Sequence, residues 1–376
     1  MTPEKSLTLH KKLKGKLEIK AKIALKTRRI LSQVYTPGVA VVVRQINKQK
    51  RSVFNLTIKN NTVAVVTDGS AVLGLGNVGA EASIPVMEGK CIIFKEFAGL
   101  NAFPICLTTQ NPEKIIETIK FISPVFAAIN LEDIAAPKCF EIEEKLQNLG
   151  IPVVHDDQQA TAIIVLAGLI NAGKVTGKKL TESRIAVCGT GAAGTAVIKL
   201  LYFYGCRKIT AVDSKGIIGS YRKDLSAYKK EIAKLTNKEN IKGSLATACR
   251  NCDILIGVSQ KGLFSENIIK SMNQKPIVFA LANPDPEIRR DEAIKAGVYV
   301  YASGRSDDKN MINNALVFPG FFKGLIKWKI NKATDQMKVN AATSISSLIV
   351  KPTKNHFIPD IFDKRLVKVI TESLRN

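Results

Sequence analysis

The sequence lacks the features that mark a membrane-spanning or disulfide-stabilised protein. No uninterrupted apolar run reaches the ~18 residues that cross a bilayer, and the basic N-terminal segment is not followed by the apolar core of a signal peptide. The seven cysteines are odd in number and lie in apolar segments, so we expect no disulfide framework and a reducing compartment. These absences predict a soluble, cytoplasmic protein with no membrane partner.

Acidic residues are scarce, because 32 Asp and Glu stand against 56 Lys and Arg and leave a net charge of +24. Such an excess can attract nucleic acid or another polyanion. The lysines are nevertheless spread along the chain, and only one Trp and no RNA-binding signature accompany them. We therefore favour a solvated basic surface that gathers an anionic small substrate, and we do not expect a nucleic-acid partner.

The first part of the chain alternates apolar strands with amphipathic helices. The expected strands are 62–68, 91–97, 104–109, 125–133 and 151–157. Strand and helix alternating at this spacing predict a parallel sheet, since parallel strands need helical crossovers between them. We expect an N-terminal α/β substrate domain over residues 1–157.

The second part repeats the alternation after a long apolar helix that begins near Thr161. Its expected strands are 184–189, the strand KITAVD that ends at Asp213, 252–259, 276–284 and 298–304. This pattern is typical of a doubly wound Rossmann-type domain, which we place over residues 158–376 as the NAD(P)-binding domain. The predicted fold class is therefore α/β with two domains.

The spacing G-x-G-x-x-G, which cradles a dinucleotide pyrophosphate, occurs twice. The two copies are Gly74, Gly76, Gly79 and Gly189, Gly191, Gly194. In the second copy a strand enters Gly189 directly, a helix follows, and Asp213 ends the next strand, which is the full context that the motif requires. In the first copy a loop precedes Gly74, and Pro85 is expected to disrupt the helix that follows.

We therefore assign the cofactor to the second copy. The residues expected to hold its pyrophosphate at a helix N-terminus are Gly189, Gly191, Ala192, Ala193 and Gly194. Asp213 should hydrogen-bond the ribose hydroxyls and repel a 2′-phosphate, which favours NAD, whereas Lys215 could pair with that phosphate and permit NADP. The first copy is interpreted as a tight loop that faces the other domain.

Acid pairs follow two of the predicted strands, at Glu132-Asp133 and Asp156-Asp157. Carboxylates that converge at the carboxyl edge of a parallel sheet make an oxygen-rich site suited to Mg²⁺ or Mn²⁺. A lysine near such a cation has a lowered pKa, so Lys90 is a candidate general base. Tyr35, before a Thr-Pro-Gly turn, could donate a proton.

Seven motifs in order give the sequence a clear resemblance. They are YTPGVA, TDGSAVLGLGNVG, PVMEGK, NLEDIAAP, HDDQQATA, ALANPDPEI and NNALVFPG. Together they resemble the short bacterial form of malic enzyme, from about residue 15 to the C-terminus. The resemblance implies oxidative decarboxylation of L-malate to pyruvate and CO₂ with NAD or NADP and a divalent metal, and it suggests a homodimer.

The resemblance also implies a role for each candidate residue. Tyr35 would be the general acid that protonates the enol, and Lys90 the base that takes the hydroxyl proton, with Lys95 as the alternative base. The implied metal ligands are Glu132, Asp133 and Asp157, and the implied malate-binding residues are Asn283 and Asn314, with Asn283 also placed beside the cofactor.

Three segments depart from the family pattern, and one of them, GVAVVVR, lacks the acid that often follows GVA. Gln159 and Ala160 replace the usual His and Gly of HDDQHGTA, and GRSDDKN replaces GRSD-x-P-N, which places acids near the expected nicotinamide pocket. We still expect activity. Two alternatives remain: a malolactic-type enzyme that keeps NAD bound and releases lactate, and a polyanion-binding relative that has lost the chemistry.

Overall fold

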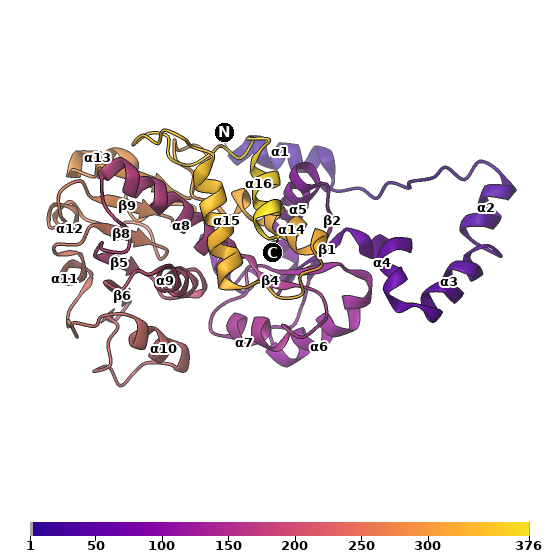
Figure 1. The fold of residues 1–376 in the computed structure, drawn as a ribbon, viewed down its shortest axis with the longest axis horizontal. Helices are drawn as coiled ribbons and strands as arrows, with labels where there is room; N and C mark the ends of the chain where they lie inside the picture. Colours follow the sequence, from indigo (N-terminus) through magenta and orange to yellow (C-terminus); the bar gives the residue numbers. More distant parts are fainter. Residues whose placement is uncertain (1–2, 376) are drawn as a thin grey trace.

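The computed structural model describes residues 3–375, which form two α/β units around two largely parallel sheets (Figure 1). The predicted α/β fold class, with a Rossmann-type second unit, is confirmed. The ends of the two predicted domains, residues 1–2 and 376, lie outside the described residues.

The first sheet has four parallel strands in the order β2-β1-β3-β4. The strands are β1 (Thr62–Thr67), β2 (Asn101–Cys106), β3 (Ala128–Leu131) and β4 (Val153–His155). The central strand β1 is buried along its whole length, as its sequence TVAVVT requires, because helices cover both faces of the sheet. The covering helices are α5 (Gly79–Ala98), α6 (Pro112–Ile122) and α7 (Lys138–Lys145). The carboxyl edge of this sheet carries the acid pairs.

The second sheet has six strands in the order β10-β9-β8-β5-β6-β7. The strands are β5 (Ile185–Cys188), β6 (Ile209–Asp213), β7 (Gly216–Ile217), β8 (Ile254–Gly257), β9 (Ile277–Ala280) and β10 (Val300–Ser303). Only β7 runs antiparallel to its neighbour. The helices of this unit are α9 (Ala192–Tyr204), α10 (Ala227–Leu235), α11 (Leu245–Cys249), α12 (Glu266–Lys270) and α13 (Arg290–Ala296). Strands β6 and β7 are added on one side of β5, and β8, β9 and β10 are added on the other side. Such sheets bind ligands at the place where this order changes sides.

Helix α8 (Asp156–Thr176) joins the two units. Within the described residues it is the one helix long and apolar enough to cross a membrane, but 72% of its apolar window is buried inside the protein. It packs against α9 and against α15 (Asp335–Ser347). The predicted boundary between residues 157 and 158 lies in its first turn. Its apolar character is that of a core helix.

The chain returns to the first unit at its C-terminal end. Helix α14 (Phe318–Lys327) packs on α5 and on α16 (Leu366–Ser373). The ring of Phe94 on α5 lies 4.7 Å from that of Phe318 and 5.2 Å from that of Phe322, centroid to centroid. Residues far apart in the sequence thus share one core.

The N-terminal helices form an arm that reaches away from the two units (Figure 1). The arm's helices are α2 (Arg28–Val34) and α3 (Val39–Lys48), preceded by α1 (Pro3–Leu13) and followed by α4 (Val53–Leu56). None of the residues of α2 or α3 is buried. The short 3₁₀ turns among the described residues are η1 (Lys50–Ser52), η2 (Ile58–Asn60), η3 (Leu73–Leu75), η4 (Ser123–Val125) and η5 (Asn314–Leu316).

Two predictions about the first glycine motif are wrong. The segment 91–97 is not a strand but the second half of α5, and this helix runs through Pro85 without interruption for 20 residues. Its buried side chains recur every three or four residues, at Met87, Cys91 and Phe94 among others, so burial of one helical face outweighs the cost of the proline.

Candidate active site

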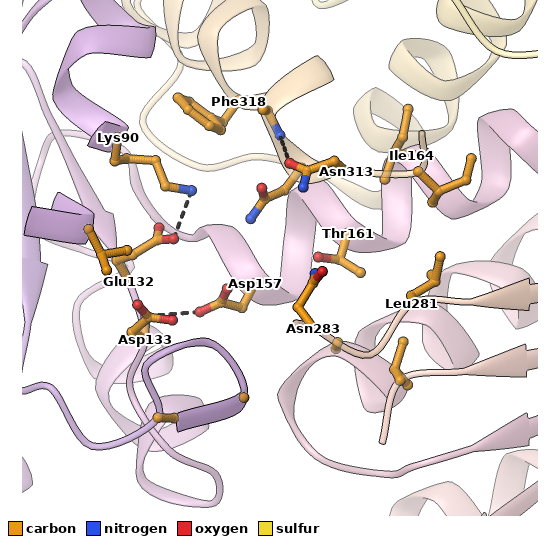
Figure 2. Close-up of a pocket in the computed structure, with 18 of the residues that line it drawn as sticks. Lys90, Glu132, Asp133, Asp157, Thr161, Ile164, Leu281, Asn283, Asn313 and Phe318 are labelled. Atoms are coloured by element: carbon orange, nitrogen blue, oxygen red, sulfur yellow. Dashed lines mark hydrogen bonds and ion pairs between the residues drawn. The ribbon is translucent and has the colours of Figure 1, made fainter. Parts of the chain in front are cut away.

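A cavity of about 480 Å³ lies between the two units and is lined by both of them (Figure 2). The first unit contributes Lys90 and the acids Glu132, Asp133 and Asp157. The second contributes Ala193 in the first turn of α9, Ser259 and Asn283 in the loops after β8 and β9, and Asn314 in the 3₁₀ turn η5. Figure 2 shows the acids with Lys90 at one side and Asn283 with Leu281 at the other. The cavity lies at the carboxyl edges of both sheets, where ligands bind in such folds.

Glu132, Asp133 and Asp157 form a compact carboxylate cluster. One oxygen of each lies within 4.8 Å of the others, and the side chains of Glu132 and Asp133 are buried. Asp133 has a left-handed backbone with φ of +51°, which is uncommon for a residue with a side chain, and its N–H donates to Asp157 at 2.9 Å. Three oxygens held this close fit a hard divalent cation such as Mg²⁺ or Mn²⁺.

Lys90 extends from α5 into this cluster. Its Nζ lies 2.7 Å from Glu132 Oε1 and 2.6 Å from Asp156 Oδ2, and it sits 4.2 Å from the centroid of the Phe318 ring. Burial alone would lower the pKa of Lys90, but the charges of Asp156, Glu132 and Asp157 outweigh burial and raise it. Without a cation in the cluster, Lys90 is therefore an ammonium group.

Asp156 connects Lys90 to the second unit, a role that the sequence alone did not indicate. Its side chain is fully buried, and its Oδ2 accepts hydrogen bonds from Lys90 and from the Asn314 amide. Burial raises the pKa of Asp156 even though the charge of Lys90 opposes that shift. The signal was present as the first acid of HDD, which follows β4 directly.

The second glycine motif forms the turn between β5 and α9. Gly189 has φ of +104°, and Gly191 precedes the first residue of α9, Ala192. A Cβ on Gly194 would lie 1.9 Å from the Gly189 carbonyl oxygen, so glycine is required for the helix to approach the strand. Ala193 lines the cavity. The turn thus presents bare backbone at a helix N-terminus, which fits a pyrophosphate.

Asp213 ends β6, next to the strand that enters this turn. Its carboxylate is not free, because Arg222 lies 2.7 Å away and Lys229 lies 2.6 Å away. Burial raises the pKa of Asp213, but hydrogen bonds from Arg222 and Lys229 outweigh burial and lower it. The acid is therefore ionised and paired.

The first glycine motif faces the second unit, as expected from the sequence. A Cβ on Gly74 would lie 1.9 Å from the carbonyl oxygen of Asn283, so the loop packs directly against the segment after β9. Gly74 also lines the cavity. Helix α5 is continuous through Pro85, so a helix break at Pro85 does not explain why this motif faces the second unit. The loop before Gly74 explains it.

Asn283 and Asn314 both line the cavity, whereas Lys95 and Tyr35 do not. Lys95 points away on α5 and donates to Asn101 at 2.8 Å. Tyr35 follows α2 on the arm and is 66% exposed. The predicted site residues that line this one cavity are Lys90, Glu132, Asp133, Asp157, Ala193, Asn283 and Asn314.

The departures from the family pattern are accommodated locally. The Gln159 amide donates to both carboxylate oxygens of Glu143 at 3.2 Å, and Ala160 is buried in the core. Asp307 pairs with Arg305, and Asp308 accepts from Ser303. Neither acid lines the cavity, but their loop lies beside it, since Arg305 donates to the carbonyl of Pro284, the residue after Asn283.

Glu287, the acid of the ALANPDPEI motif, is a further buried residue, and the sequence alone suggested no role for it. It is fully buried after β9, and it accepts hydrogen bonds from the N–H of Ser259 at 2.9 Å and of Ala282 at 3.0 Å. Burial raises the pKa of Glu287 despite these hydrogen bonds. A Cβ on Gly257 would lie 2.4 Å from its carboxyl carbon, so Gly257 makes room for it. Glu287 ties together two loops that line the cavity.

A dinucleotide turn facing a carboxylate cluster and a buried lysine across one cavity defines a two-domain, dinucleotide-dependent dehydrogenase. The profile of the malic enzyme N-terminal domain matches residues 14–147, and that of the malic enzyme NAD-binding domain matches residues 158–370. The chain belongs to the malic enzyme family, and the resemblance inferred from its motifs is confirmed.

Relatives and solved structures of this family cover nearly the whole chain. A bifunctional malic/malolactic enzyme of Bacillus subtilis is 46% identical over 99% of this chain and 92% of its own length. An NAD-dependent malic enzyme of Geobacillus stearothermophilus is 48% identical over 96% of this chain and 76% of its own. The crystal structure of an NAD-dependent malic enzyme from Thermotoga maritima superposes with a TM-score of 0.96 at 44% identity, and 99% of each chain is covered.

Proposed function

We propose that this protein oxidatively decarboxylates L-malate to pyruvate and CO₂ with a divalent metal and NAD, with NADP as the alternative cofactor. The observation that carries the proposal is the cluster of Glu132, Asp133 and Asp157 with Lys90, which faces the dinucleotide turn across one cavity. In the proposed division of labour, residues 1–157 supply the metal ligands and the base, and residues 158–376 hold the cofactor.

The chemistry needs a group that takes the hydroxyl proton of malate, and Lys90 is the candidate. A cation held by Glu132, Asp133 and Asp157 would polarise the oxygen of the substrate, and the nicotinamide would accept the hydride. The charges of Asp156, Glu132 and Asp157 raise the pKa of Lys90, and a cation bound beside them would offset part of that negative charge. Lys90 can then lose its proton and act as the base.

The substrate carboxylate needs donors on the other side of the cavity. The amide side chains of Asn283 and Asn314 supply them without adding charge, and the hydrogen bond from Asn314 to Asp156 fixes its orientation. Asp156 thereby links the base to the carboxylate-binding residue. This link supports a role for Asp156 in positioning both.

We propose that the working form is a homodimer, because the arm that carries Tyr35 exposes apolar side chains. Apolar side chains are exposed along the arm, including Leu31 at 44%, Val41 at 62% and Val43 at 59%. We infer that a partner covers these exposed apolar side chains. Because Tyr35 lies on the same exposed arm, it can serve as the general acid only if the assembly brings it to a cavity.

We also propose that the protein acts in the cytoplasm.

A malolactic reaction is the second candidate, because the Bacillus subtilis relative is described as a bifunctional malic/malolactic enzyme. In that reaction the cofactor stays bound and returns its hydride, so that lactate is released without net NADH. The same cavity and lysine serve both outcomes. What separates them is whether the reduced cofactor leaves before the product does.

The test is an absorbance assay at 340 nm with purified protein, L-malate, Mn²⁺ and either NAD or NADP, with pyruvate and lactate measured in the same tube. The expected result is metal-dependent reduced cofactor with an equal amount of pyruvate. Lactate without reduced cofactor would move the function to the malolactic reaction. No product with either cofactor would contradict both candidates.

A further inference from the structure

The first glycine motif lies in a loop between β1 and α5, residues 69–79, which has no role in the chemistry proposed above. We call these residues the first glycine loop. The loop closes on itself, because the carbonyl of Gly69 accepts a hydrogen bond from the N–H of Gly79 at 3.2 Å. Ala71 and Gly74 of the loop line the cavity. The loop therefore lies where the carboxylate cluster and the second unit come together.

On one side, the first glycine loop holds the backbone around Asp133, a candidate metal ligand. The N–H of Ala71 donates to the Asp133 carbonyl at 3.0 Å, and the Ser70 hydroxyl accepts from the N–H of Ala135 at 2.9 Å. Asp133 has a left-handed backbone with φ of +51°, which costs free energy and persists only where the surrounding structure fixes it. The loop supplies two of the contacts that fix it.

The Ser70 side chain is itself held by a buried acid at the end of β1. Oδ1 of Asp68 accepts from the Ser70 hydroxyl at 2.5 Å and from the Ser70 N–H at 3.0 Å. The other carboxylate oxygen of Asp68 pairs with Lys138, the first residue of α7. Because the hydroxyl proton of Ser70 is given to Asp68, the hydroxyl oxygen is oriented to accept from Ala135.

On its other side, the loop contacts the segment that carries Asn283. A Cβ on Gly74 would lie 1.9 Å from the Asn283 carbonyl oxygen and 2.8 Å from Cδ of Pro284. Any side chain at Gly74 would therefore push the segment after β9 away from the first unit. Asn283 lines the cavity and is the proposed partner of a malate carboxylate. One loop thus contacts both the backbone of a metal ligand and that of a substrate-binding residue.

We propose that the first glycine loop sets the distance between the carboxylate cluster and Asn283, with Ser70 and Gly74 as positioning residues on its two sides. A substrate that binds the cation through one end and Asn283 through the other fits only if this distance is kept, since small displacements of binding groups are costly. The inference rests on the proposed function, because it assumes a cation in the cluster and malate beside it.

The first experiment measures Mn²⁺ binding by electron paramagnetic resonance, without malate or dinucleotide. Ser70→Ala removes the acceptor for the Ala135 N–H, so we expect Mn²⁺ affinity to fall by about tenfold, as for other residues that orient metal ligands. Ser70→Thr keeps the hydroxyl and should restore the affinity to within about threefold of the wild type. Wild-type Mn²⁺ affinity in Ser70→Ala would overturn the proposal.

The second experiment tests the other side of the loop and keeps the proposal testable if Ser70→Ala folds poorly. Gly74 lies in the 3₁₀ turn η3, a backbone conformation that alanine also adopts. In Gly74→Ala we expect affinity for L-malate to fall by about tenfold or more and Mn²⁺ affinity to stay within about threefold. Isothermal titration of L-malate into the protein saturated with Mn²⁺, without dinucleotide, measures the first. Unchanged malate affinity, or equal losses of both, would overturn the proposal.

The control is Leu75→Ala, because Leu75 is next to Gly74, is 68% exposed and does not line the cavity. It should change neither affinity. Losses in this variant as large as those of Ser70→Ala and Gly74→Ala would overturn the assignment to these two residues. Both measurements are made without turnover, so equal affinities in all variants would refute the inference alone, whereas a wild-type protein that forms no pyruvate or lactate would refute the proposed function alone.

Discussion

At the scale of single residues, Lys90 and Lys95 offer a direct comparison because both belong to α5. Lys90 is buried among acids, whereas Lys95 is exposed and donates to Asn101. We predict that Lys90→Ala lowers malate oxidation by about 100-fold or more while NADH binding is kept, since a general base contributes at least that factor. Absorbance at 340 nm and NADH fluorescence measure the two effects.

The control for this prediction is Lys95→Ala, which should stay within a few-fold of the wild type. Turnover of Lys90→Ala within a few-fold of the wild type would remove Lys90 from the mechanism. A large loss in Lys95→Ala alone would instead move the base to the alternative that the sequence left open.

Glu287 leads to a prediction about positioning rather than chemistry. Glu287→Gln keeps the shape of the side chain but turns one acceptor toward the N–H of Ser259 or Ala282 into a donor. A buried unsatisfied donor costs about 1–3 kcal/mol, so we expect a lower melting temperature and a raised KM for the dinucleotide with a smaller change in kcat. The exposed Glu266→Gln, which loses only a surface pair with Lys270, is the control.

The contrary result for Glu287 would be a large fall in kcat with an unchanged KM for the dinucleotide. That outcome would place the carboxylate in the chemical step. Such a role would conflict with its position, because Glu287 is fully buried and does not line the cavity.

At the scale of elements, the dinucleotide turn yields a matched pair of glycine substitutions. A Cβ at Gly194 would meet the Gly189 carbonyl at 1.9 Å, whereas a Cβ at Gly191 would have no atom within 4 Å. Gly194→Ala should therefore lose about 1–3 kcal/mol of unfolding free energy along with NADH binding, as overpacked sites do. Thermal or urea unfolding and NADH fluorescence measure the two losses.

Gly191→Ala should instead remain as stable as the wild type and bind NADH on the order of tenfold more weakly, because its methyl group obstructs the close approach of the pyrophosphate to backbone. Unchanged NADH binding by Gly191→Ala would remove this turn from the cofactor site. A stable Gly194→Ala would show that α9 can shift away from the strand.

Helix α5 shows which elements the sequence could and could not predict. Strand β1 and the acids after β3 and β4 were expected correctly, because continuous apolar runs and a following acid have one interpretation in a parallel sheet. The run CIIFKEF was ambiguous, since a short apolar run fits a strand or a buried helix. The helical spacing from Met87 through Phe94 was present, but Pro85 argued against a continuous helix and favoured the wrong interpretation.

The candidate site was predictable where a motif and a strand end coincide, as at Glu132, Asp157 and Gly189. The roles of Asp156, Glu287 and Arg222 were not predicted, because they depend on partners that only the folded chain brings within hydrogen-bond distance. The contact between Lys90 and the Phe318 ring was not predictable either, because only the folded chain brings these two residues together.

At the scale of the whole molecule, the arm carries the next prediction. Val41→Asp with Val43→Asp places two charges on the most exposed apolar part of α3, and a buried unpaired charge is costly. If the arm forms the proposed dimer interface, the pair should weaken association by roughly 100-fold or more and lower turnover in parallel. Sedimentation velocity and the 340 nm assay measure both.

The control for the arm is Val350→Asp, since Val350 is 86% exposed and lies outside the arm. It should change neither association nor turnover. A dimer that survives the double substitution would exclude α3 from the interface. A monomer with full activity would mean that catalysis does not need dimerisation to bring Tyr35 to a cavity.

The return of α14 to α5 has a consequence for how the protein is made. Lys90 is synthesised long before the ring that covers it, Phe318, and before helix α16, which packs on the helix that carries that ring. The first unit therefore cannot complete its interior until α14 has emerged, because Phe94 lacks two of its aromatic neighbours until then. A chain that stops before α14 and α16 therefore lacks part of the core of the unit that carries Lys90.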